Sequence, residues 1–378
     1  MQFEDLGTSR TRRTLTVSTA FLRRLHIDEP LLLGLLAIIA FGLVVLYSAS
    51  GQNLLVVRAQ ALRFALAIAA MVLVANVNPR HLRMIAVPGW TIGVLLLMVV
   101  AVVGHVGKGA QRWLDLGFMR FQPSELMKLA VPLACAWYLH ERALPPTLRN
   151  LVIPLAFVLV PVALIIEQPD LGTALLILAS GALVILMAGL RVWVIVVALV
   201  LVLVGGYIGW EFMHDYQRQR ILTFLNPQSD PLGAGYHIIQ SQIAIGSGGM
   251  FGKGWMNGSQ AQLEFLPERS TDFIFAVIGE EFGLLGLMLL IGLYLFVIGR
   301  TLFMAFEAQD TFSRLVAGSL SITFFVYVFV NTGMVSGLLP VVGVPLPLVS
   351  YGGSSMVTLM AGFGILMSLH SHRKLVGS

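Results

Sequence analysis

Ten long apolar stretches dominate this sequence and restrict what it can fold into. Most are long enough to cross the roughly 30 Å hydrocarbon core of a bilayer as helices. The expected spans lie near residues 31–50, 59–77, 85–104, 124–140, 151–167, 171–189, 192–211, 273–299, 312–337 and 351–369. Only 11% of the residues are charged, far fewer than a soluble domain needs to cover its surface. We therefore predict an all-α polytopic membrane protein with about ten transmembrane helices.

Basic residues in the connecting loops set the expected orientation, because cytoplasmic loops are enriched in Lys and Arg. With the N-terminus in the cytoplasm, every inner loop has at least one basic residue. Ten spans then return the C-terminus, with Arg373 and Lys374, to the same side. We expect residues 1–30 to be a cytoplasmic tail and residues 31–378 to be a single membrane domain. The first apolar stretch is typical of an uncleaved anchor.

Two extracytoplasmic loops, residues 105–123 and 212–272, carry most of the polar chemistry. The second lies between the seventh and eighth spans and is far longer than a connector needs to be. Within it, residues 236–245 have the pattern of an amphipathic helix. Such a helix either lies in the membrane interface and presents a lipid-linked substrate, or plugs the outer end of the bundle.

Nucleotides and nucleic acids are not expected ligands. The glycine-rich residues 246–254 match neither the phosphate-loop nor the dinucleotide pattern. The net charge of +5 comes from scattered basic residues rather than a dense stripe, so we predict no nucleic-acid partner. His105 and His140 have no partner at metal-ligand spacing, so the residues indicate no protein metal site.

Asp272 lies at the boundary between the large loop and the eighth span. A carboxylate there reaches both water and a lipid head group, so it is placed to act as a general base on a sugar hydroxyl. The alternative is that Asp272 caps the helix that follows, which is common for Asp at such a position. The residues alone favour the cap.

Glu125 and Lys128 stand three residues apart at the start of the fourth span, on one helix face. Both are costly in lipid unless they face a cavity or each other. They either line a polar cavity for a charged substrate or form an interfacial ion pair in which the lysine extends to water. We favour the cavity, because the preceding loop adds polar side chains on the same side: Lys108, Arg112, Trp113 and Arg120.

Four further carboxylates lie in or beside the spans. Glu280 and Glu281 lie within the eighth span, where they act either in a function such as proton relay or in packing through hydrogen bonds. Glu167 and Asp170 lie in a tight outer turn, where they either line the outer cavity or stand in the wet interface.

Seven segments rich in polar residues, glycine or proline stand out along the chain. They are KGAQRWLDLG (108–117), RFQPSE (120–125), QPDLGT (168–173), HDYQRQR (214–220), DPLGAGYHIIQS (230–241), EFLPERSTDFIFAVIGEE (264–281) and PVVGVPLPLVSYGGSS (340–355). Together they resemble the SEDS family (shape, elongation, division and sporulation), and its elongation branch more than its division branch. The resemblance runs from the first span to the C-terminal residues, and residues 1–25 lie outside it.

The resemblance implies ten spans with both termini cytoplasmic. It also implies a peptidoglycan glycosyltransferase that polymerises lipid II, the undecaprenyl-pyrophosphate-linked disaccharide-pentapeptide, into β-1,4 glycan strands during cell elongation. The expected location is the inner membrane of a bacterium, with the active site facing outward. By resemblance, the family's essential aspartate falls on Asp272, and its glutamate and lysine that face the cavity fall on Glu125 and Lys128.

The expected reaction is an inverting glycosyl transfer with Asp272 as the base. The leaving pyrophosphate needs positive charge. The candidate cations are Lys108, Arg112, Arg120, Arg218, Arg220 and Arg269. The sequence requires no cofactor, although a divalent cation, Mg or Mn, could assist. The resemblance further implies a class B penicillin-binding protein as the partner that supplies the transpeptidase.

Two other classes of function compete with the enzyme. A lipid II flippase would need polar groups through the depth of the bilayer, whereas a polymerase needs them at the outer face. Charged residues deep in the spans are few, which favours the polymerase. The third class is a scaffold that only recruits a partner.

Overall fold

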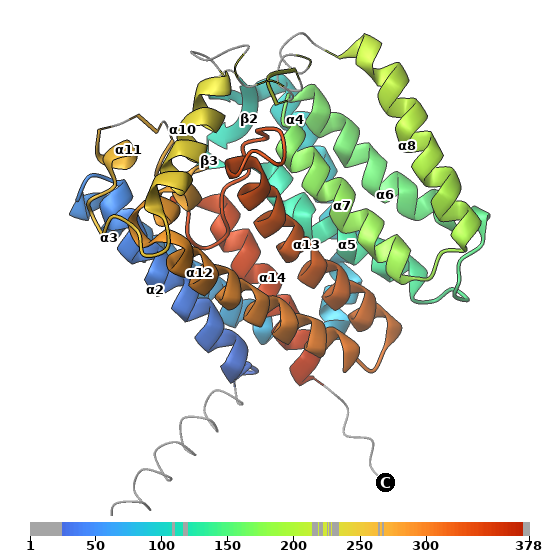
Figure 1. Ribbon diagram of the computed structural model, residues 1–378. Helices are drawn as coiled ribbons and strands as arrows, with labels where there is room; N and C mark the ends of the chain where they lie inside the picture. The colour runs from blue at the N-terminus through green and yellow to red at the C-terminus, as the bar shows by residue number, and fades with distance from the viewer. Residues whose placement is uncertain are drawn as a thin grey trace, which may run out of the picture.

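The computed structural model describes residues 25–107, 110–115, 120–213, 218, 222–224, 226, 228, 234–263, 265–266 and 268–372. In this part of the chain, ten helices stand where the ten spans are expected (Figure 1). They are α2 (Glu29–Ala49), α3 (Leu54–Ala75), α4 (Pro79–Val103), α5 (Pro123–Leu139), α6 (Leu148–Glu167), α7 (Leu171–Met187), α8 (Val192–Phe212), α12 (Ile274–Phe306), α13 (Thr311–Val335) and α14 (Ser354–Ser371).

The helices confirm the prediction of an all-α membrane protein. Eight of those described are long and apolar enough to cross a bilayer, and the apolar α7 has 17 residues. The remaining helix, α5, also has 17 residues and carries the charged pair Glu125 and Lys128. The span expected at 151–167 begins earlier, at Leu148, and reaches 20 residues. The count of ten spans stays a prediction.

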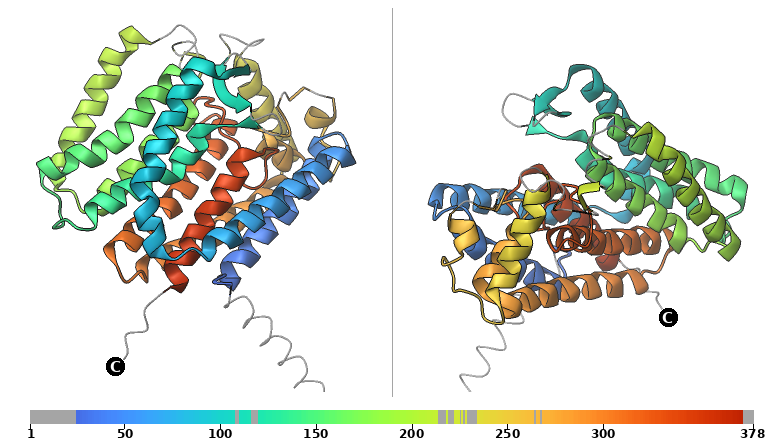
Figure 2. Two further views of the ribbon diagram at one scale, coloured as in Figure 1. Left: turned by 180° about the vertical axis from the view of Figure 1, so that it is seen from behind. Right: turned by 45° about the horizontal axis from the view of Figure 1, so that its top comes forward.

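The bundle has two distinct ends. The described chain begins and ends at the same end of the bundle (Figure 1). There the His26 and His372 rings stack, with their centroids 4.1 Å apart. We call this the terminal end. The opposite end, here the loop end, carries the short strands and the helices α10 (Ala234–Gly248) and α11 (Ser259–Gln262). Figure 2 shows the connection between α13 and α14 in the middle of the loop end.

A small sheet at the loop end was not expected. The strands β1 (His105–Gly107), β2 (Ala110–Asp115) and β3 (Arg120–Phe121) form an antiparallel sheet in the order β1-β2-β3. The sequence predicts only a polar loop for this segment. Strands of two to six residues are too short to give a clear alternating pattern, so periodicity misses them.

The predicted amphipathic helix in the large loop is confirmed as α10. Its buried face includes Ile238, Ser241 and Ala244 and packs against α12 and α13. The Ser241 hydroxyl donates a hydrogen bond of 2.8 Å to the Val335 carbonyl at the end of α13. Of the two predicted roles, the structure therefore favours packing on the end of the bundle.

An ion pair joins the start of α2 to α12 at the terminal end. Asp28 is the N-cap of α2, and its carboxylate accepts a hydrogen bond from the Leu31 amide. The Arg300 guanidinium on α12 donates two more hydrogen bonds to it, of 3.0 and 2.6 Å. Burial raises the pKa of Asp28, but the hydrogen bonds from Arg300 and Leu31 outweigh it and hold the pKa below its ordinary value.

Replacing Asp28 with alanine should lower the free energy of unfolding by about 2 kcal/mol, because it removes a helix cap and a charge-assisted hydrogen-bonded pair. Asp28→Asn keeps the cap and should lose less. Since the folded pKa is depressed, the contribution of Asp28 should be present above its unfolded pKa and be lost as the pH falls through its folded pKa. Thermal unfolding in detergent at two pH values measures both effects, and unchanged melting in Asp28→Ala would contradict the assignment.

Candidate active site

A polar cavity of about 230 Å³ opens at the loop end of the bundle. Its walls come from β2, α5, α7, α13, the connection between α13 and α14, and the start of α14. The lining residues are Arg112, Trp113, Gln122, Glu125, Lys128, Asp170, Thr173, Leu176, Tyr327, Gly343, Val344, Pro345, Gly352, Gly353, Ser354 and Ser355. Four predicted site residues therefore share this cavity: Arg112, Trp113, Glu125 and Lys128.

Glu125 and Lys128 form a buried ion pair in the wall of the cavity. Their side chains are only 5% and 10% exposed, and Lys128 Nζ lies 2.7 Å from Glu125 Oε1. The helix that carries them begins at Pro123, whose ring is well suited to the first helical turn. Lys128 Nζ also lies 5.2 Å from the centre of the Tyr327 ring. The two predicted roles are thus combined, since the side chains pair with each other and also line the cavity.

The second oxygen of Glu125 has an unused bonding capacity. Glu125 Oε2 is buried and accepts no hydrogen bond from the described residues. The neighbouring Ser124 hydroxyl is also buried and has no hydrogen-bond partner among them. A buried acceptor without a donor is costly, by about 1–3 kcal/mol. A hydroxyl or amide of a bound ligand would satisfy Glu125 Oε2.

Arg112 lines the cavity, but the turn after α6 holds its guanidinium. Arg112 Nε donates to the Gln168 carbonyl at 3.1 Å, and Nη2 donates to the Pro169 carbonyl. Its Nη1 lies 3.8 Å from Asp170 Oδ2. The arginine therefore supplies positive charge beside the cavity, with part of its hydrogen-bonding capacity already used.

Asp170 also lines the cavity, which resolves one of the predicted alternatives. It is the N-cap of α7, where its carboxylate accepts from the Thr173 amide at 3.2 Å. The Gln122 side chain donates to its other oxygen at 3.0 Å. Glu167, in contrast, is exposed and does not line the cavity.

Backbone contacts fix the segment that ends in Asp272. The Ser270 carbonyl accepts from the Tyr351 amide at 2.8 Å, and the Thr271 carbonyl accepts from the Ser350 hydroxyl at 2.6 Å. Both donors belong to the connection between α13 and α14, which also lines the cavity. The segment before α12 is thus held against the cavity wall at two successive residues.

Asn331 makes the third contact to this segment. Its side chain on α13 donates to the Asp272 carbonyl at 2.9 Å and to the Val344 carbonyl at 2.7 Å. Asn331 therefore links the segment that ends in Asp272 to Val344, which lines the cavity. The N-cap of α12 is Phe273 and not Asp272. The alternative role predicted for Asp272, as the cap of this helix, is therefore wrong.

Gly343 shows how near the Asp272 carboxylate lies to the cavity. Gly343 lines the cavity, and a Cβ placed on it would lie 3.6 Å from Asp272 Oδ2. Its φ of 70° is in the left-handed region that favours glycine. Asp272 itself is not a lining residue, and its carboxylate lies next to the part of the wall that Gly343 forms, in the cavity lined by Glu125 and Lys128.

Replacing Gly343 with alanine should disturb the site more than the fold. The left-handed backbone should cost about 1–2 kcal/mol of stability. The new methyl group would stand in van der Waals contact with Asp272 Oδ2, so a backbone shift that relieves the strain would also move the carboxylate. We expect the activity of this site to fall about tenfold or more, because small displacements of reacting groups are costly. Gly205→Ala on α8 is the matched control, since a Cβ there meets no atom within 4 Å. Equal activity for both variants would contradict this reading.

Of the remaining predicted cations, Arg218 and Arg269 have described side chains, and neither lines the cavity. Arg218 donates to the Trp210 and Glu211 carbonyls at 2.9 and 2.7 Å, at the end of α8. Arg269 donates to the Ala261 carbonyl. Arg120 pairs with Asp115 through the backbone of β3, and its side chain is not among the described atoms. Lys108 and Arg220 lie outside the described residues.

The sequence reading missed the contribution of α13 and of the chain that follows it. Tyr327, Ser354 and Ser355 line the cavity together with residues 343–345 and 352–353. The available signal was the segment PVVGVPLPLVSYGGSS, whose prolines and glycines interrupt two apolar spans. Such an interruption at membrane depth is tolerated where the chain lines a cavity or is buried in protein.

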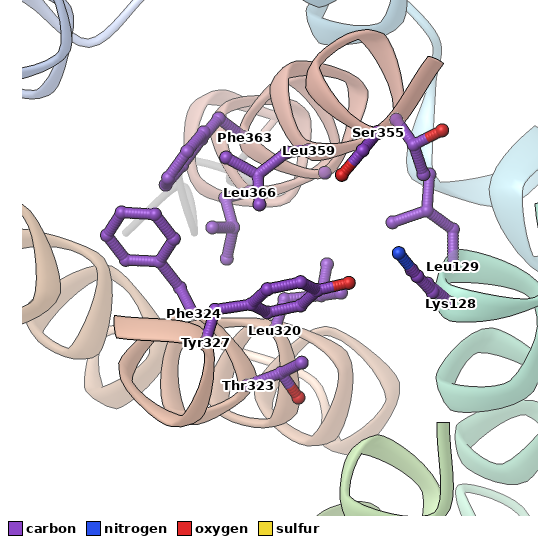
Figure 3. A pocket seen from close by; sticks show the side chains of 12 residues that line it. Lys128, Leu129, Leu320, Thr323, Phe324, Tyr327, Ser355, Leu359, Phe363 and Leu366 are labelled. Carbon is purple, nitrogen blue, oxygen red and sulfur yellow. The ribbon is translucent and has the colours of Figure 1, made fainter. Parts of the chain in front are cut away.

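A second, apolar pocket of about 40 Å³ adjoins the cavity between α5, α13 and α14 (Figure 3). Lys128, Tyr327 and Ser355 line both spaces. The Phe324 and Phe363 rings and Leu366 form its apolar end, away from Lys128. A polar space and an apolar space thus lie side by side and share three lining residues.

The described residues do not form a metal site by themselves. In this part of the chain, no three His, Cys, Asp or Glu side chains come together as metal ligands. Of the two carboxylates that line the cavity, Asp170 accepts from Gln122 and Thr173, and Glu125 is paired with Lys128 through Oε1 alone. A divalent cation bound with a ligand's own phosphates stays a prediction.

Known proteins are similar to this chain along nearly its whole length. Residues 28–375 match the model of a family described as cell cycle protein, FtsW, RodA and SpoVE. The peptidoglycan glycosyltransferase MrdB of Escherichia coli K12 is 53% identical, over 94% of this chain and 96% of that protein. The protein of the same name from Helicobacter pylori 26695 is 43% identical over 75% of each chain.

Two solved structures share the fold. One is a chain from a structure that describes how a peptidoglycan synthase complex coordinates polymerization and crosslinking. It has a TM-score of 0.81 and 32% identity, over 92% of this chain and 98% of that one. The rod shape determining protein RodA of Thermus thermophilus has a TM-score of 0.70 and 30% identity, over 92% of this chain and 97% of that one.

Proposed function

This chain belongs to the FtsW, RodA and SpoVE family of cell cycle proteins, and from that membership we propose how it works. It is a multi-pass membrane protein and a peptidoglycan glycosyltransferase. Its substrate is lipid II, its product is a β-1,4 glycan strand, and Asp272 is the general base. The observation that carries the assignment of the base is the Asp272 carboxylate at the wall of a cavity that holds a buried glutamate and lysine.

The reaction is a single displacement at the anomeric carbon of the donor. Asp272 accepts the proton of the C4 hydroxyl on the acceptor N-acetylglucosamine. The freed oxygen attacks C1 of the donor N-acetylmuramic acid from the face opposite the pyrophosphate. The C1–O bond breaks, and its electron pair leaves with the undecaprenyl pyrophosphate. An α-linked donor therefore gives a β-1,4 bond, and the free energy comes from the donor without a nucleotide.

Positive charge at the cavity stabilises the leaving pyrophosphate. Among the described cations, Lys128 and Arg112 line the cavity and are the first candidates. Lys108, Arg120 and Arg220, whose side chains the structure does not describe, complete the proposed set. Arg218 and Arg269 donate to backbone carbonyls outside the cavity and are not part of it. Trp113 supplies an aromatic face in the same wall. Mg or Mn carried by the pyrophosphate would add charge of the same sign.

Glu125 orients the substrate through its unused oxygen. Glu125 Oε1 holds Lys128, which leaves Oε2 to accept from a sugar hydroxyl or an acetamido N–H. The adjoining apolar pocket receives the first isoprene units of the prenyl chain. The pyrophosphate head group and the prenyl tail of lipid II then lie on the two sides of Lys128, which lines both the cavity and the apolar pocket.

The loop end faces the outside of the bacterial inner membrane, and the terminal end faces the cytoplasm. Lipid II presented there is polymerised by this chain and crosslinked by a class B penicillin-binding protein that binds it. The support is the similarity to a chain of a peptidoglycan synthase complex and the basic residues of the predicted inner loops.

The placement of buried charge favours polymerisation over transport. Among the described residues, the buried charged ones are Glu125, Lys128, Asp170, Glu280 and Glu281. All lie within about two turns of the helix ends at the loop end. A flippase needs a polar path through the whole depth of the bilayer, and these groups do not extend that far.

Purified chain with its crosslinking partner and lipid II tests the proposal. We expect glycan strands on a gel, lengthening with time and sensitive to a muramidase. The same preparation in vesicles should not move lipid II from one leaflet to the other. Translocation without any polymer would overturn the proposed reaction in favour of the flippase.

A further inference from the structure

A break in α12 is closed by the large loop. Gly283 has φ 64° and ψ −160°, so it separates the first nine residues of α12 from the rest. The break frees backbone groups on both sides, and loop residues 249–254 pair with them. The bonds are Lys253 N to Glu280 O (2.9 Å), Gly254 N to Glu281 O (3.0 Å), Leu284 N to Gly249 O (2.9 Å) and Leu285 N to Met250 O (3.2 Å). Residues 249–254 of the loop therefore supply the backbone hydrogen bonds that α12 lacks at its break.

Glu280 holds the next part of the loop. Its side chain is 0% exposed, and it accepts four hydrogen bonds from residues 253–261. The donors are Lys253 Nζ (2.7 Å), Ser259 Oγ (3.1 Å), Gln260 N (3.0 Å) and Ala261 N (3.3 Å). A buried carboxylate is stable only with such a set of donors, so the loop and Glu280 depend on each other.

Hydrogen bonds lead from Glu280 to the segment that ends in Asp272. Ala261 donates its amide to Glu280 Oε2, and its carbonyl accepts from Arg269. Arg269 stands three residues before Asp272 on a short segment of chain. Ala261 is buried, and its hydrogen bond from Arg269 is partly buried. The Asp272 segment is thus held by Asn331, Ser350 and Tyr351 on one side and by the loop on the other.

We propose that Glu280 is a positioning residue: it fastens residues 253–261 to α12 and, through Ala261 and Arg269, sets the position of Asp272. The proposal rests on Asp272 being the base. It assigns Glu280 a fixed structural task at the site, in place of the proton relay that an intramembrane carboxylate suggests. Both of its oxygens accept hydrogen bonds from the described loop, with the Lys253 ammonium as the charged partner.

The test combines kinetics with a probe of the loop. Glu280→Gln keeps one acceptor and loses the charge, whereas Glu280→Ala loses both. Glu307→Gln, at the opposite end of the same helix, is the matched control. The full chain with its partner is assayed on lipid II, and rates are divided by the amount of folded protein. In parallel, Ala261→Cys in a Cys135→Ser background reports the loop through its rate of maleimide labelling, because position 261 is buried while the loop is docked.

We expect Glu280→Gln to lower kcat about tenfold with KM changed less than twofold, because a shifted base slows chemistry more than binding. Labelling of Cys at position 261 should become several times faster, and Glu280→Ala should exaggerate both effects. Glu307→Gln should match the parent in both. Faster labelling with an unchanged kcat, or a lower kcat with unchanged labelling, would overturn the proposal.

Asp272→Ala in the same background separates this proposal from the proposed base. No polymer with labelling equal to the parent supports both assignments. If Asp272→Ala still polymerises normally, Asp272 is not the base and the positioning role of Glu280 falls with it. The labelling of the Glu280 variants would then report only how the loop is held.

Discussion

Replacing Asp272 with asparagine should lower the rate of lipid II polymerisation by a factor of about 10²–10⁴, the usual contribution of a general base. Asparagine has the same shape and cannot take up the proton of the attacking hydroxyl. The chain around it should stay in place, because the contacts to Ser270, Thr271 and Asp272 are made through their backbone carbonyls. The loss should therefore be in kcat, with lipid II binding nearly unchanged.

Two further measurements make the Asp272 result interpretable. The variant should melt within a few degrees of the parent and bind the crosslinking partner equally well. Asp272→Glu should regain part of the activity, because it restores a carboxylate at a displaced position. If Asp272→Asn polymerises lipid II at the parent rate, the carboxylate has only a structural role next to α12, and the base must be sought elsewhere in the cavity.

The bundle could be predicted from sequence because lipid imposes simple rules on it. A span needs about twenty apolar residues, and the ten apolar stretches coincide with ten helices of the described chain. The position of Asp272 followed from the same pattern, since the loop ends where the apolar stretch begins. The pairing of Glu125 with Lys128 followed from their spacing on one helix face.

The loop end was less predictable, because its structure depends on contacts between residues distant in sequence. Arg269 looks like any basic residue of a polar loop, yet it donates to the Ala261 carbonyl. Arg218 likewise contacts the end of α8. The break at Gly283 lies inside the stretch predicted as one span, and the sequence gives no sign that residues 249–254 pair with the backbone groups on either side of it.

The ion pair in the cavity yields the second large effect. Lys128→Met should lower the free energy of unfolding by about 3–5 kcal/mol, because it leaves the buried Glu125 carboxylate without its partner. It should also lower polymerisation at least a hundredfold, since an unpaired negative charge repels the pyrophosphate where positive charge is needed. Thermal unfolding and a lipid II polymerisation assay measure the two losses separately.

The double variant Glu125→Gln with Lys128→Met distinguishes stability from catalysis. It removes both charges, so it should regain most of the lost stability. Its polymerisation should stay low, because neither the Lys128 cation nor the Glu125 acceptor is restored. Recovery of activity together with stability would mean that the pair only supports the fold. The exposed pair Arg83 and Asp310, 2.6 Å apart at the terminal end, is the control. Arg83→Met should cost no more than about 1 kcal/mol and leave polymerisation unchanged.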